Sequence, residues 1–257
     1  MKIAINGARG RMGRMVLEAA AGESGVEVGA LLETAGHPET GREIASPWGP
    51  LALHTDPAAA DEVDVGIDFS HPSGAVPFAR ALALRGIPVV VGTTGLSPAD
   101  MDALREAAAG APILVASNTS VGVHCLHELS RMARAMLGPR YDVEIVEIHH
   151  RHKRDAPSGT AMTLAEGLSD GSLTVVTGRE GQCGPRGPEE LGVLAVRGGE
   201  VIGDHTIYFL GDHDRIEITH RASSRLALAQ GAIHLARRLV GRAPGLVRVA
   251  DLFGGEG

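Results

Sequence analysis

The first 120 residues alternate short runs of β-branched residues with alanine-rich stretches, and this alternation is the strongest constraint on the fold. Strands of nearly continuous apolar residues that are separated by helices indicate a parallel sheet covered on both faces. We expect strands at Lys2–Asn6, Glu27–Glu33, Val63–Phe69, Ile87–Gly92 and Pro112–Ser117. We expect helices at Gly10–Ala21, Ser73–Arg85 and Ser97–Ala109. The last helix opens on a serine followed by proline, which is typical of an N-cap.

The pattern changes after a helix expected at Val121–Leu137. Longer strands are predicted at Val143–His150, Gly192–Arg197, Val201–Phe209 and Arg215–His220. The turns at 197–200 and 211–214 join consecutive strands directly, which predicts antiparallel hairpins. This part is therefore interpreted as an α+β domain with an open mixed or antiparallel sheet.

The chain is expected to divide into two domains, one of residues 1–119 plus about 224–257 and one of residues 120–223. A final helix at Ser224–Val240 and an apolar tail at Leu246–Phe253 are predicted to return to the first domain. A stretch rich in glycine and proline, Thr177–Pro188, is predicted to be a mobile surface loop.

Composition narrows the class of protein. With 257 residues, 44% of them hydrophobic, the chain can bury the cores of two modest domains. A formal charge of −7 and 3% aromatic residues argue against nucleic acid as a partner and favour a small substrate. No run approaches the roughly 18 to 20 apolar residues of a membrane span, and no basic leader precedes the first strand, so a cytoplasmic location is expected. Cys125 and Cys183 lie far apart and predict reduced thiols.

A glycine motif follows the first strand and opens the first helix. Gly7, Gly10 and Gly13 have the spacing G-x-x-G-x-x-G, a variant of the dinucleotide fingerprint. Such glycines allow a tight turn and let backbone N–H groups approach a pyrophosphate at the positive end of the helix. The alternative is an ordinary turn between strand and helix. The position of the motif favours a Rossmann-like domain that binds NADH or NADPH. The residues of the loop that we expect to contact the cofactor are Gly7, Ala8, Arg9, Gly10, Arg11 and Met12.

Other cofactor contacts are expected at strand ends. Glu33 ends the second strand, where a carboxylate can accept hydrogen bonds from ribose hydroxyls, which favours NAD. The alternative is a solvated acid at a strand end. Arg9 and Arg11 can pair with a 2′-phosphate, so use of NADP stays open. Ligands of open α/β sheets bind at the carboxyl ends of the strands, so two further segments are candidates for the nicotinamide half, with ordinary turns as the alternative. Their residues are Gly92, Thr93 and Thr94, and Ala116, Ser117, Asn118 and Thr119.

The segment from His149 to Thr160 concentrates chemistry suited to a substrate that carries carboxylates. If the strand continues, its alternation places His150 and His152 on the face opposite His149. A histidine can deliver a proton near neutral pH, and Lys153 offers a cation to a carboxylate or to developing negative charge. Ser158 is expected to be an N-cap, which leaves the N–H groups of the next two residues, Gly159 and Thr160, free to attract an anion.

Two other readings of these histidines stay open. They can form a solvated or satisfied strand end, or they can bind a metal ion, although no cysteine or acidic set accompanies them and no metal is expected. His124 and His127, which flank Cys125 at helical spacing, are interpreted as ordinary helix positions. His213 and His220 are expected to be structural or exposed.

The chain resembles the 4-hydroxy-tetrahydrodipicolinate reductase family, also called dihydrodipicolinate reductase, of bacterial lysine and diaminopimelate synthesis. Glu144–Ala161 meets every fixed position of the family pattern E-[IV]-x-E-x-H-x-x-x-K-x-D-x-P-S-G-T-A. The similarity extends over nearly the whole chain, and it includes Gly7–Gly13, Gly92–Gly95, Ser117–Val123 and Glu217–Arg225.

The resemblance implies a hydride from NADH or NADPH and a small cyclic dicarboxylate as substrate. It also implies a hinge that closes over the substrate and a homotetramer built by the open sheet of the second domain. His149 would donate the proton and Lys153 would assist it. The residues implied in substrate binding are His150, Gly159 and Thr160, with Ser158 adjacent.

The chain departs from the family pattern at two positions. Thr119 stands where many members have an aromatic residue, so stacking on the nicotinamide is in doubt. Thr34 stands where some members have an arginine that holds the 2′-phosphate, so use of NADP then depends on Arg9 and Arg11. The alternatives are a related two-domain dehydrogenase that acts on another small carboxylate, and a nicotinamide-sensing protein without turnover.

Overall fold

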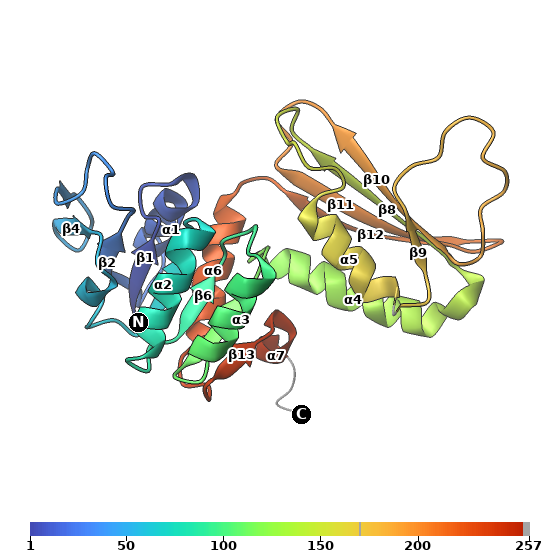
Figure 1. Cartoon of the computed structure of the whole chain (residues 1–257). Helices are drawn as coiled ribbons and strands as arrows, with labels where there is room; N and C mark the ends of the chain where they lie inside the picture. The colour runs from blue at the N-terminus through green and yellow to red at the C-terminus, as the bar shows by residue number, and fades with distance from the viewer. Residues whose placement is uncertain (170, 254–257) are drawn as a thin grey trace. The chain divides into compact units, whose positions relative to one another are not determined.

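Residues 1–169 and 171–253 are described by the computed structural model, and the chain divides into two units (Figure 1). Met1–Ser120 and the segment that starts at Arg225 belong to the first unit, and Val121–Ser224 forms the second.

The first unit is built on a sheet with the strand order β13-β7-β6-β5-β1-β2-β4-β3. All neighbouring strands are parallel except β3 and β4, which pair antiparallel. The strands are β1 (Lys2–Asn6), β2 (Glu27–Leu32), β3 (Glu43–Ile44), β4 (Leu51–His54), β5 (Val65–Asp68), β6 (Val89–Val91), β7 (Pro112–Val115) and β13 (Gly245–Val247).

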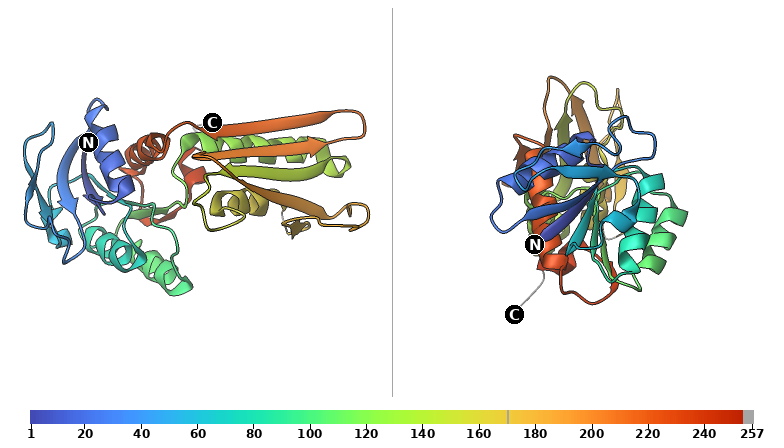
Figure 2. Two further views of the ribbon diagram at one scale, coloured as in Figure 1. Left: turned by 90° about the horizontal axis from the view of Figure 1, so that it is seen from above. Right: turned by 90° about the vertical axis from the view of Figure 1, so that its left-hand side faces the viewer.

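Helices cover both faces of this sheet, as the right-hand view of Figure 2 shows. They are α1 (Arg11–Ala21), α2 (Pro72–Ala83), α3 (Pro98–Ala107), α6 (Leu226–Leu239) and the short α7 (Val249–Phe253), with a 3-10 turn, η1 (Pro57–Ala59). Ile3 and Ile5 of β1 pack with α1 and α6, whereas Ala4 between them packs with α2 and α3. Both faces of β1 are therefore buried, which explains its uninterrupted apolar sequence.

The five strands and three helices predicted before residue 120 are all present, with ends that differ by at most two residues. The additional strands β3, β4 and β13 were not predicted. Each has only two to four residues, too few to show a periodicity. β13 adds a parallel strand beside β7, so the apolar tail returns to the first unit as expected.

The second unit has a mixed sheet with the order β12-β11-β8-β10-β9. β8 pairs parallel with β10 and antiparallel with β11. The strands are β8 (Asp142–His149), β9 (Thr174–Val176), β10 (Glu190–Arg197), β11 (Gly203–Leu210) and β12 (Arg215–Ala222). The helices are α4 (Val121–Leu137) and α5 (Gly159–Ser169), with a 3-10 turn, η2 (Gly138–Arg140).

One of the two predicted hairpins is wrong. β11 and β12 form the expected antiparallel pair, but β10 and β11 are not neighbours, because β8 lies between them. The turn after β10 passes across the end of β8, where Gly198 N–H donates to His149 O (3.0 Å) and Arg151 N–H donates to Gly199 O (3.2 Å). A turn sequence rich in glycine fits this crossing as well as it fits a tight hairpin.

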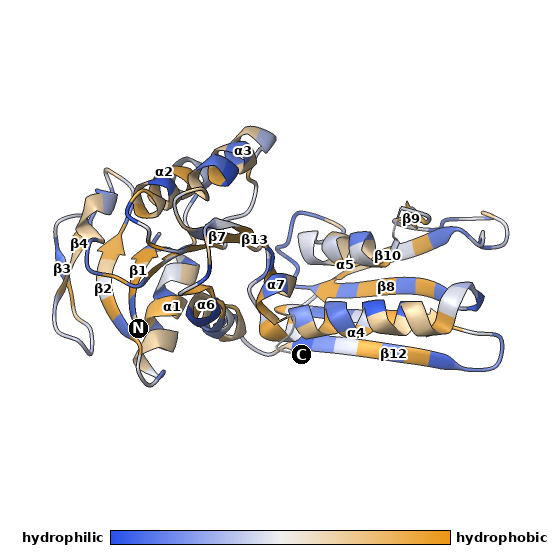
Figure 3. Cartoon of the chain, turned by 90° about the horizontal axis from the view of Figure 1, so that it is seen from below, coloured by the Kyte–Doolittle hydropathy of each residue, from blue (hydrophilic) through white to orange (hydrophobic). Residues whose placement is uncertain are grey.

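β8 alternates strictly between buried and partly exposed side chains, and its buried face changes from apolar (Val143, Ile145) to polar (Glu147, His149) along the strand. Figure 3 shows apolar and polar bands along β8. Val143 and Ile145 belong to the core with Leu164 of α5 and Leu126 of α4. The other face carries half-buried side chains such as Val146 and no helix of the described part of this unit packs there. The sheet is therefore open on one side.

The loop predicted at Thr177–Pro188 lies at the surface, but two arginines tie it to the sheet. Arg179 donates to the carboxylate of Glu144 (3.0 and 3.1 Å), and Arg186 donates to Glu144 (3.0 Å) and Asp142 (2.8 Å). These bonds restrain the loop, an effect that its glycine and proline content did not predict.

None of the helices in residues 1–169 and 171–253 combines the length and the hydropathy of a bilayer-spanning segment.

Candidate active site

The glycine loop lies tightly against the neighbouring strand end. Gly7 has a φ of +74°, a conformation that favours glycine, and a Cβ there would lie 2.5 Å from Phe69 O. A Cβ on Gly13 would collide with the carbonyl of Gly7. Helix α1 begins after Gly10, which offers no side-chain cap, so the loop presents an uncapped positive helix end. The glycine loop and the start of α1 therefore fit the binding of a pyrophosphate group.

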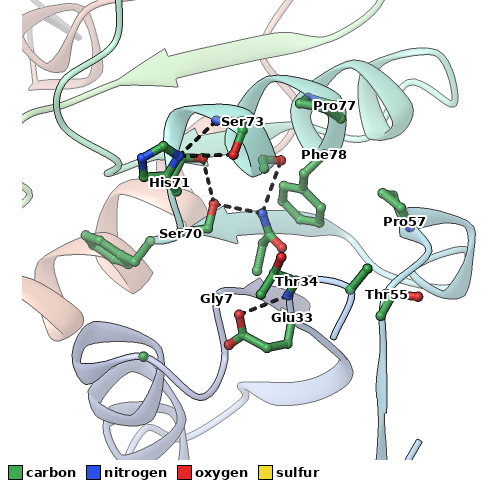
Figure 4. A pocket seen from close by; sticks show the side chains of 15 residues that line it. Gly7, Glu33, Thr34, Thr55, Pro57, Ser70, His71, Ser73, Pro77 and Phe78 are labelled. Carbon is green, nitrogen blue, oxygen red and sulfur yellow. Dashed lines mark hydrogen bonds between the residues drawn. The ribbon is translucent and has the colours of Figure 1, made fainter. Parts of the chain in front are cut away.

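A cavity of about 550 Å³ opens beside this loop (Figure 4). Three predicted cofactor residues, Gly7, Gly10 and Glu33, line it. The Glu33 carboxylate accepts N–H bonds from Arg9 (3.0 Å) and Thr34 (2.9 Å), which fixes it at the end of β2. Its position suits the recognition of ribose hydroxyls.

The opposite part of the cavity comes from the end of β5 and the start of α2, with Ser70, His71 and Ser73. Sequence reasoning missed these residues, although Ser70 and His71 directly follow a predicted strand, the same signal that was applied to the two later strand ends.

A buried hydrogen-bond network centred on Asp68 lies next to these residues. Asp68 has no exposed surface, and it accepts hydrogen bonds from Asn6 Nδ2 (2.7 Å), Ser70 Oγ (2.5 Å) and Thr93 Oγ1 (2.6 Å). Burial raises the pKa of Asp68, and these donors oppose that rise. The network fixes three strand ends around the cavity.

The other predicted cofactor residues do not line this cavity. Ala8 is buried, and Arg11 and Met12 lie on the first turn of α1. Thr93 donates its hydroxyl hydrogen bond to Asp68, and Gly92 packs against the ring of Phe69. Thr119 is 2% exposed, and its hydroxyl donates to Leu228 O of α6 (2.6 Å). That side chain points into the fold. The remaining members of the set are Thr94 and Ser117, both exposed, Ala116, which is buried, and Asn118, which accepts from Ser120 N–H (2.9 Å).

The end of β8 carries a buried hydrogen-bonded cluster. Glu147 and His149, two residues apart, point to the same face of the strand, and His149 Nδ1 bonds to the Glu147 carboxylate. Arg197 at the end of β10 donates to both oxygens of Glu147 (2.7 and 2.8 Å), and Ser158 N–H donates to it as well (3.0 Å). Glu147 has no exposed surface, so these donors replace the water that would otherwise solvate its charge.

The cluster determines the protonation of His149. Burial alone would raise the pKa of Glu147, but the bonds from Arg197 and His149 hold it below its ordinary value, so Glu147 is a carboxylate. A carboxylate can accept hydrogen bonds but cannot donate them, so the hydrogen of the bond between His149 and Glu147 must be carried by Nδ1 of His149. Burial lowers the pKa of His149 more than Glu147 raises it, and the cations Lys153 and Arg197 add to the decrease. The exchangeable proton of His149 is therefore the one on Nε2.

His205 and Ser158 complete the surroundings of His149. The ring of His205 packs edge-on against His149, with centroids 5.2 Å apart, and its Nε2 lies 3.3 Å from Ser158 Oγ. Burial, with the nearby His149, lowers the pKa of His205 to about 4. Ser158 Oγ also accepts from Ala161 N–H (3.1 Å), which makes it the predicted cap of α5. Ser158 is 2% exposed, so its hydroxyl stabilises the start of α5 and is shielded from solvent.

Lys153 and Asp155 lie between the strand and α5. Lys153 Nζ contacts both oxygens of Asp155 at 2.8 Å. The bond from Lys153 is the largest cause of a lowered pKa of Asp155, and the backbone N–H of Gly159 contributes. The Gly159 N–H at the start of α5 therefore lies close enough to act on the Asp155 carboxyl. Thr160 lies in the first turn of α5.

The other histidines have separate places. β8 ends at His149, so His150 and His152 follow the strand, and their rings lie 6.2 Å apart. His150 Nδ1 is buried without a hydrogen-bond partner. His127 bonds to Glu128 and packs against Gly167 of α5. In the described part of the chain, no group of three or more His, Cys, Asp or Glu side chains is arranged to hold a metal ion. Both cysteines are free thiols.

A parallel sheet with a glycine loop at a helix start, joined to a second unit that carries an oriented histidine, is the organisation of two-domain pyridine-nucleotide oxidoreductases. The chain is of that class. It belongs to the dihydrodipicolinate reductase family: residues 1–119 match the description "Dihydrodipicolinate reductase, N-terminus" and residues 122–253 match "Dihydrodipicolinate reductase, C-terminus".

Known proteins agree with this membership. The chain is 42% identical over 263 residues to the 4-hydroxy-tetrahydrodipicolinate reductase of Thiobacillus denitrificans, covering 99% of this chain and 98% of the relative. It is 40% identical over 266 residues to that of Anaeromyxobacter dehalogenans strain 2CP-C, covering 100% and 98%. The fold is similar to that of a dipicolinate-bound dihydrodipicolinate reductase from Paenisporosarcina sp. TG-14, with a TM-score of 0.78, 20% identity and 98% of each chain covered.

Proposed function

We propose that this protein reduces 4-hydroxy-tetrahydrodipicolinate, a cyclic dicarboxylate, to tetrahydrodipicolinate in lysine and diaminopimelate synthesis. The overall change adds a hydride and a proton to the substrate and releases water. The observation that carries the proposal is the buried bond from His149 Nδ1 to Glu147, which leaves Nε2 as the proton-delivering atom. In this scheme the first unit binds NADH or NADPH and the second unit binds the substrate and builds the oligomer.

The first unit supplies the contacts for the cofactor. The loop of Gly7 and Gly10 and the uncapped start of α1 would hold the pyrophosphate, and Glu33 would hold the adenosine ribose. When bound, the dihydronicotinamide supplies the hydride. Because Thr119 is turned into the fold, this chain makes no use of that side chain for stacking on the nicotinamide.

The second unit supplies the proton. In the free protein the lowered pKa of His149 keeps its ring largely neutral at pH 7. A substrate with two negative charges raises the pKa of a nearby imidazole, so binding of the substrate favours the protonated ring. His149 then holds one proton on Nδ1, directed at Glu147, and a second on Nε2 that it can donate.

Lys153 and the start of α5 provide the positive charge that a dicarboxylate needs. Lys153 Nζ is bonded to Asp155, and the N–H of Gly159 is close enough to lower the pKa of the same carboxyl, so both donors lie beside one side chain. His150, with a buried Nδ1 that lacks a partner, and Thr160 are the further contacts we propose for the substrate. Ser158 contributes indirectly, by capping α5 and donating its N–H to Glu147.

We also propose a cytoplasmic homotetramer assembled through the open face of the second sheet. That face carries apolar side chains over which no helix from the described residues of this unit packs, and Val196 at the end of β10 is 46% exposed. Val146→Lys places a charge in the middle of this face and should dissociate the assembly. Sedimentation analysis of the wild type and the variant measures the oligomeric state, and a monomeric wild type would reject the proposal.

The reaction itself can be tested with substrate generated by its synthase. Oxidation of NADH and of NADPH is followed with and without the synthase, and tetrahydrodipicolinate is identified as the product. Turnover that depends on the synthase supports the proposed reaction. Binding of cofactor without turnover would indicate a sensing protein, and turnover only with other carboxylates or amino acids would indicate a related dehydrogenase.

A further inference from the structure

The side chain of Arg9, in the glycine loop, forms an ion pair with a second acidic residue, Glu39. Its Nε lies 2.7 Å from Glu39 Oε2 and its Nη2 lies 3.0 Å from Glu39 Oε1, a bidentate pair. The side chains are 18% and 29% exposed, so water screens this pair less than it screens a surface ion pair. The backbone N–H of Arg9 meanwhile donates to Glu33.

The backbone holds Glu39 in place. A series of turns leads from Thr34 to Arg42, with hydrogen bonds His37 N–H to Thr34 O (3.1 Å), Thr40 N–H to His37 O (3.0 Å) and Arg42 N–H to Glu39 O (3.0 Å). Gly41 N–H then donates to Leu53 O (2.8 Å), and Leu53 N–H donates to Arg42 O (2.9 Å), which fastens the segment to β4. Glu39 is therefore presented to Arg9 by the fold and is not a chance contact of a free loop.

We propose that Glu39 determines cofactor selectivity by occupying Arg9 and so disfavours the 2′-phosphate of NADPH relative to NADH. This inference rests on the proposed binding of a dinucleotide with its adenosine ribose at Glu33. A 2′-phosphate at that ribose would meet the carboxylate of Glu33, while the side chain of the neighbouring Arg9 stays engaged by Glu39 unless it exchanges its partner. Thr34 offers no compensating charge.

The chemistry distinguishes the two cofactors sharply. The 2′-hydroxyl of NADH needs only an acceptor, which Glu33 supplies, so NADH gains nothing when Arg9 is released. The 2′-phosphate needs a cation with paired donors, which a released Arg9 would supply. Arg11 lies exposed on the first turn of α1, and Glu39 pairs with Arg9, so Arg11 can still contact a 2′-phosphate and NADPH binding is weakened by Glu39 and not abolished.

The decisive variant is Glu39→Gln, which removes the charge and keeps the shape of the side chain. Glu43→Gln is the matched control, because Glu43 is an exposed acid four residues further along the same segment and forms no ion pair with Arg9. Arg9→Ala and the double variant Arg9→Ala/Glu39→Gln show whether the effect passes through Arg9.

Dissociation constants are measured at low ionic strength for NADH, NADPH, 5′-AMP and adenosine 2′,5′-bisphosphate. Glu39→Gln should tighten binding of the two 2′-phosphorylated probes by about tenfold and leave the other two unchanged, and the gain should vanish in the Arg9→Ala background. An equal change for all four probes, no change, or a gain that persists without Arg9 would overturn the inference while leaving the proposed function intact. If the wild type binds neither NADH nor NADPH, the proposed cofactor use itself fails, and the inference fails with it.

Discussion

His149 and Glu147 lie two residues apart on β8, and Nδ1 of the histidine bonds to a carboxylate that has no contact with solvent. The period of two along a strand puts both side chains on the same face. Arg197 and the N–H of Ser158 fix the carboxylate in turn, so the histidine ring is held by groups from β10 and the start of α5.

This relationship predicts a shift in the pH profile of Glu147→Gln. The rate constant kcat/KM should fall as pH rises through the pKa of His149, because the general acid loses its proton. Glu147 raises that pKa, so its neutral replacement should move the decline to lower pH and reduce the rate at pH 7. Glu144→Gln removes a carboxylate of the same strand that binds arginines elsewhere, and it should leave the profile in place. Identical profiles for both variants would show that Glu147 does not act on His149.

Gly203 leaves room for the proton-delivering atom. A Cβ at this position would lie 2.9 Å from His149 Nε2, so Gly203→Ala must displace the ring or cover that nitrogen. We expect turnover to fall by about 10- to 100-fold with unchanged affinity for NADH, since small misplacements of a catalytic group are costly. Gly198→Ala, which meets nothing within 4 Å in the turn nearby, is the control for adding a methyl group. Equal turnover of the two variants would argue against Nε2 as the donor.

His205 should make the fold sensitive to acid. The pKa of His205 is about 4 in the folded protein, and its ordinary value of 6.5 applies to the unfolded chain. Between these two pH values the unfolded chain binds a proton at His205 and the folded chain does not, so acid favours unfolding. The free energy of unfolding should drop by about 3 kcal/mol from this group between pH 6.5 and pH 4. Urea unfolding at several pH values compares the wild type with His205→Gln. The variant should lose less stability in acid, and parallel curves would contradict the assignment.

Ser158 should matter for stability more than for substrate affinity. Its buried hydroxyl caps α5, so Ser158→Ala should lower the free energy of unfolding by about 1 kcal/mol. Ser158→Thr, which keeps a hydroxyl, tests whether the cap is the cause. A large increase in KM without loss of stability would instead place the hydroxyl on the substrate.

The sequence predicts those features that depend on neighbours along the chain. The glycine loop, the capping of α5 by Ser158 and the common face of Glu147 and His149 all follow from short spacings and from the periods of strand and helix. The parallel sheet of the first unit follows for the same reason, because its strands carry an uninterrupted apolar pattern.

The partners that come from distant segments could not be predicted in this way. Arg197 reaches Glu147 only because β8 pairs with β10, whereas the turn after Arg197 indicated a hairpin with β11. The pairing of Arg9 with Glu39 likewise depends on where a chain of turns ends, and the orientation of Thr119 depends on the packing of α6. Each of these contacts depends on tertiary packing, which produces no periodic pattern in the sequence.

The most direct test is the turnover of His149→Gln with synthase-generated substrate, measured together with the dissociation constant for NADH. Glutamine keeps the polarity of the site but cannot act as a general acid, a role that typically contributes about 10²- to 10⁴-fold. We expect a loss of turnover in that range with NADH affinity close to that of the wild type. An unchanged rate would show that His149 is not the proton donor.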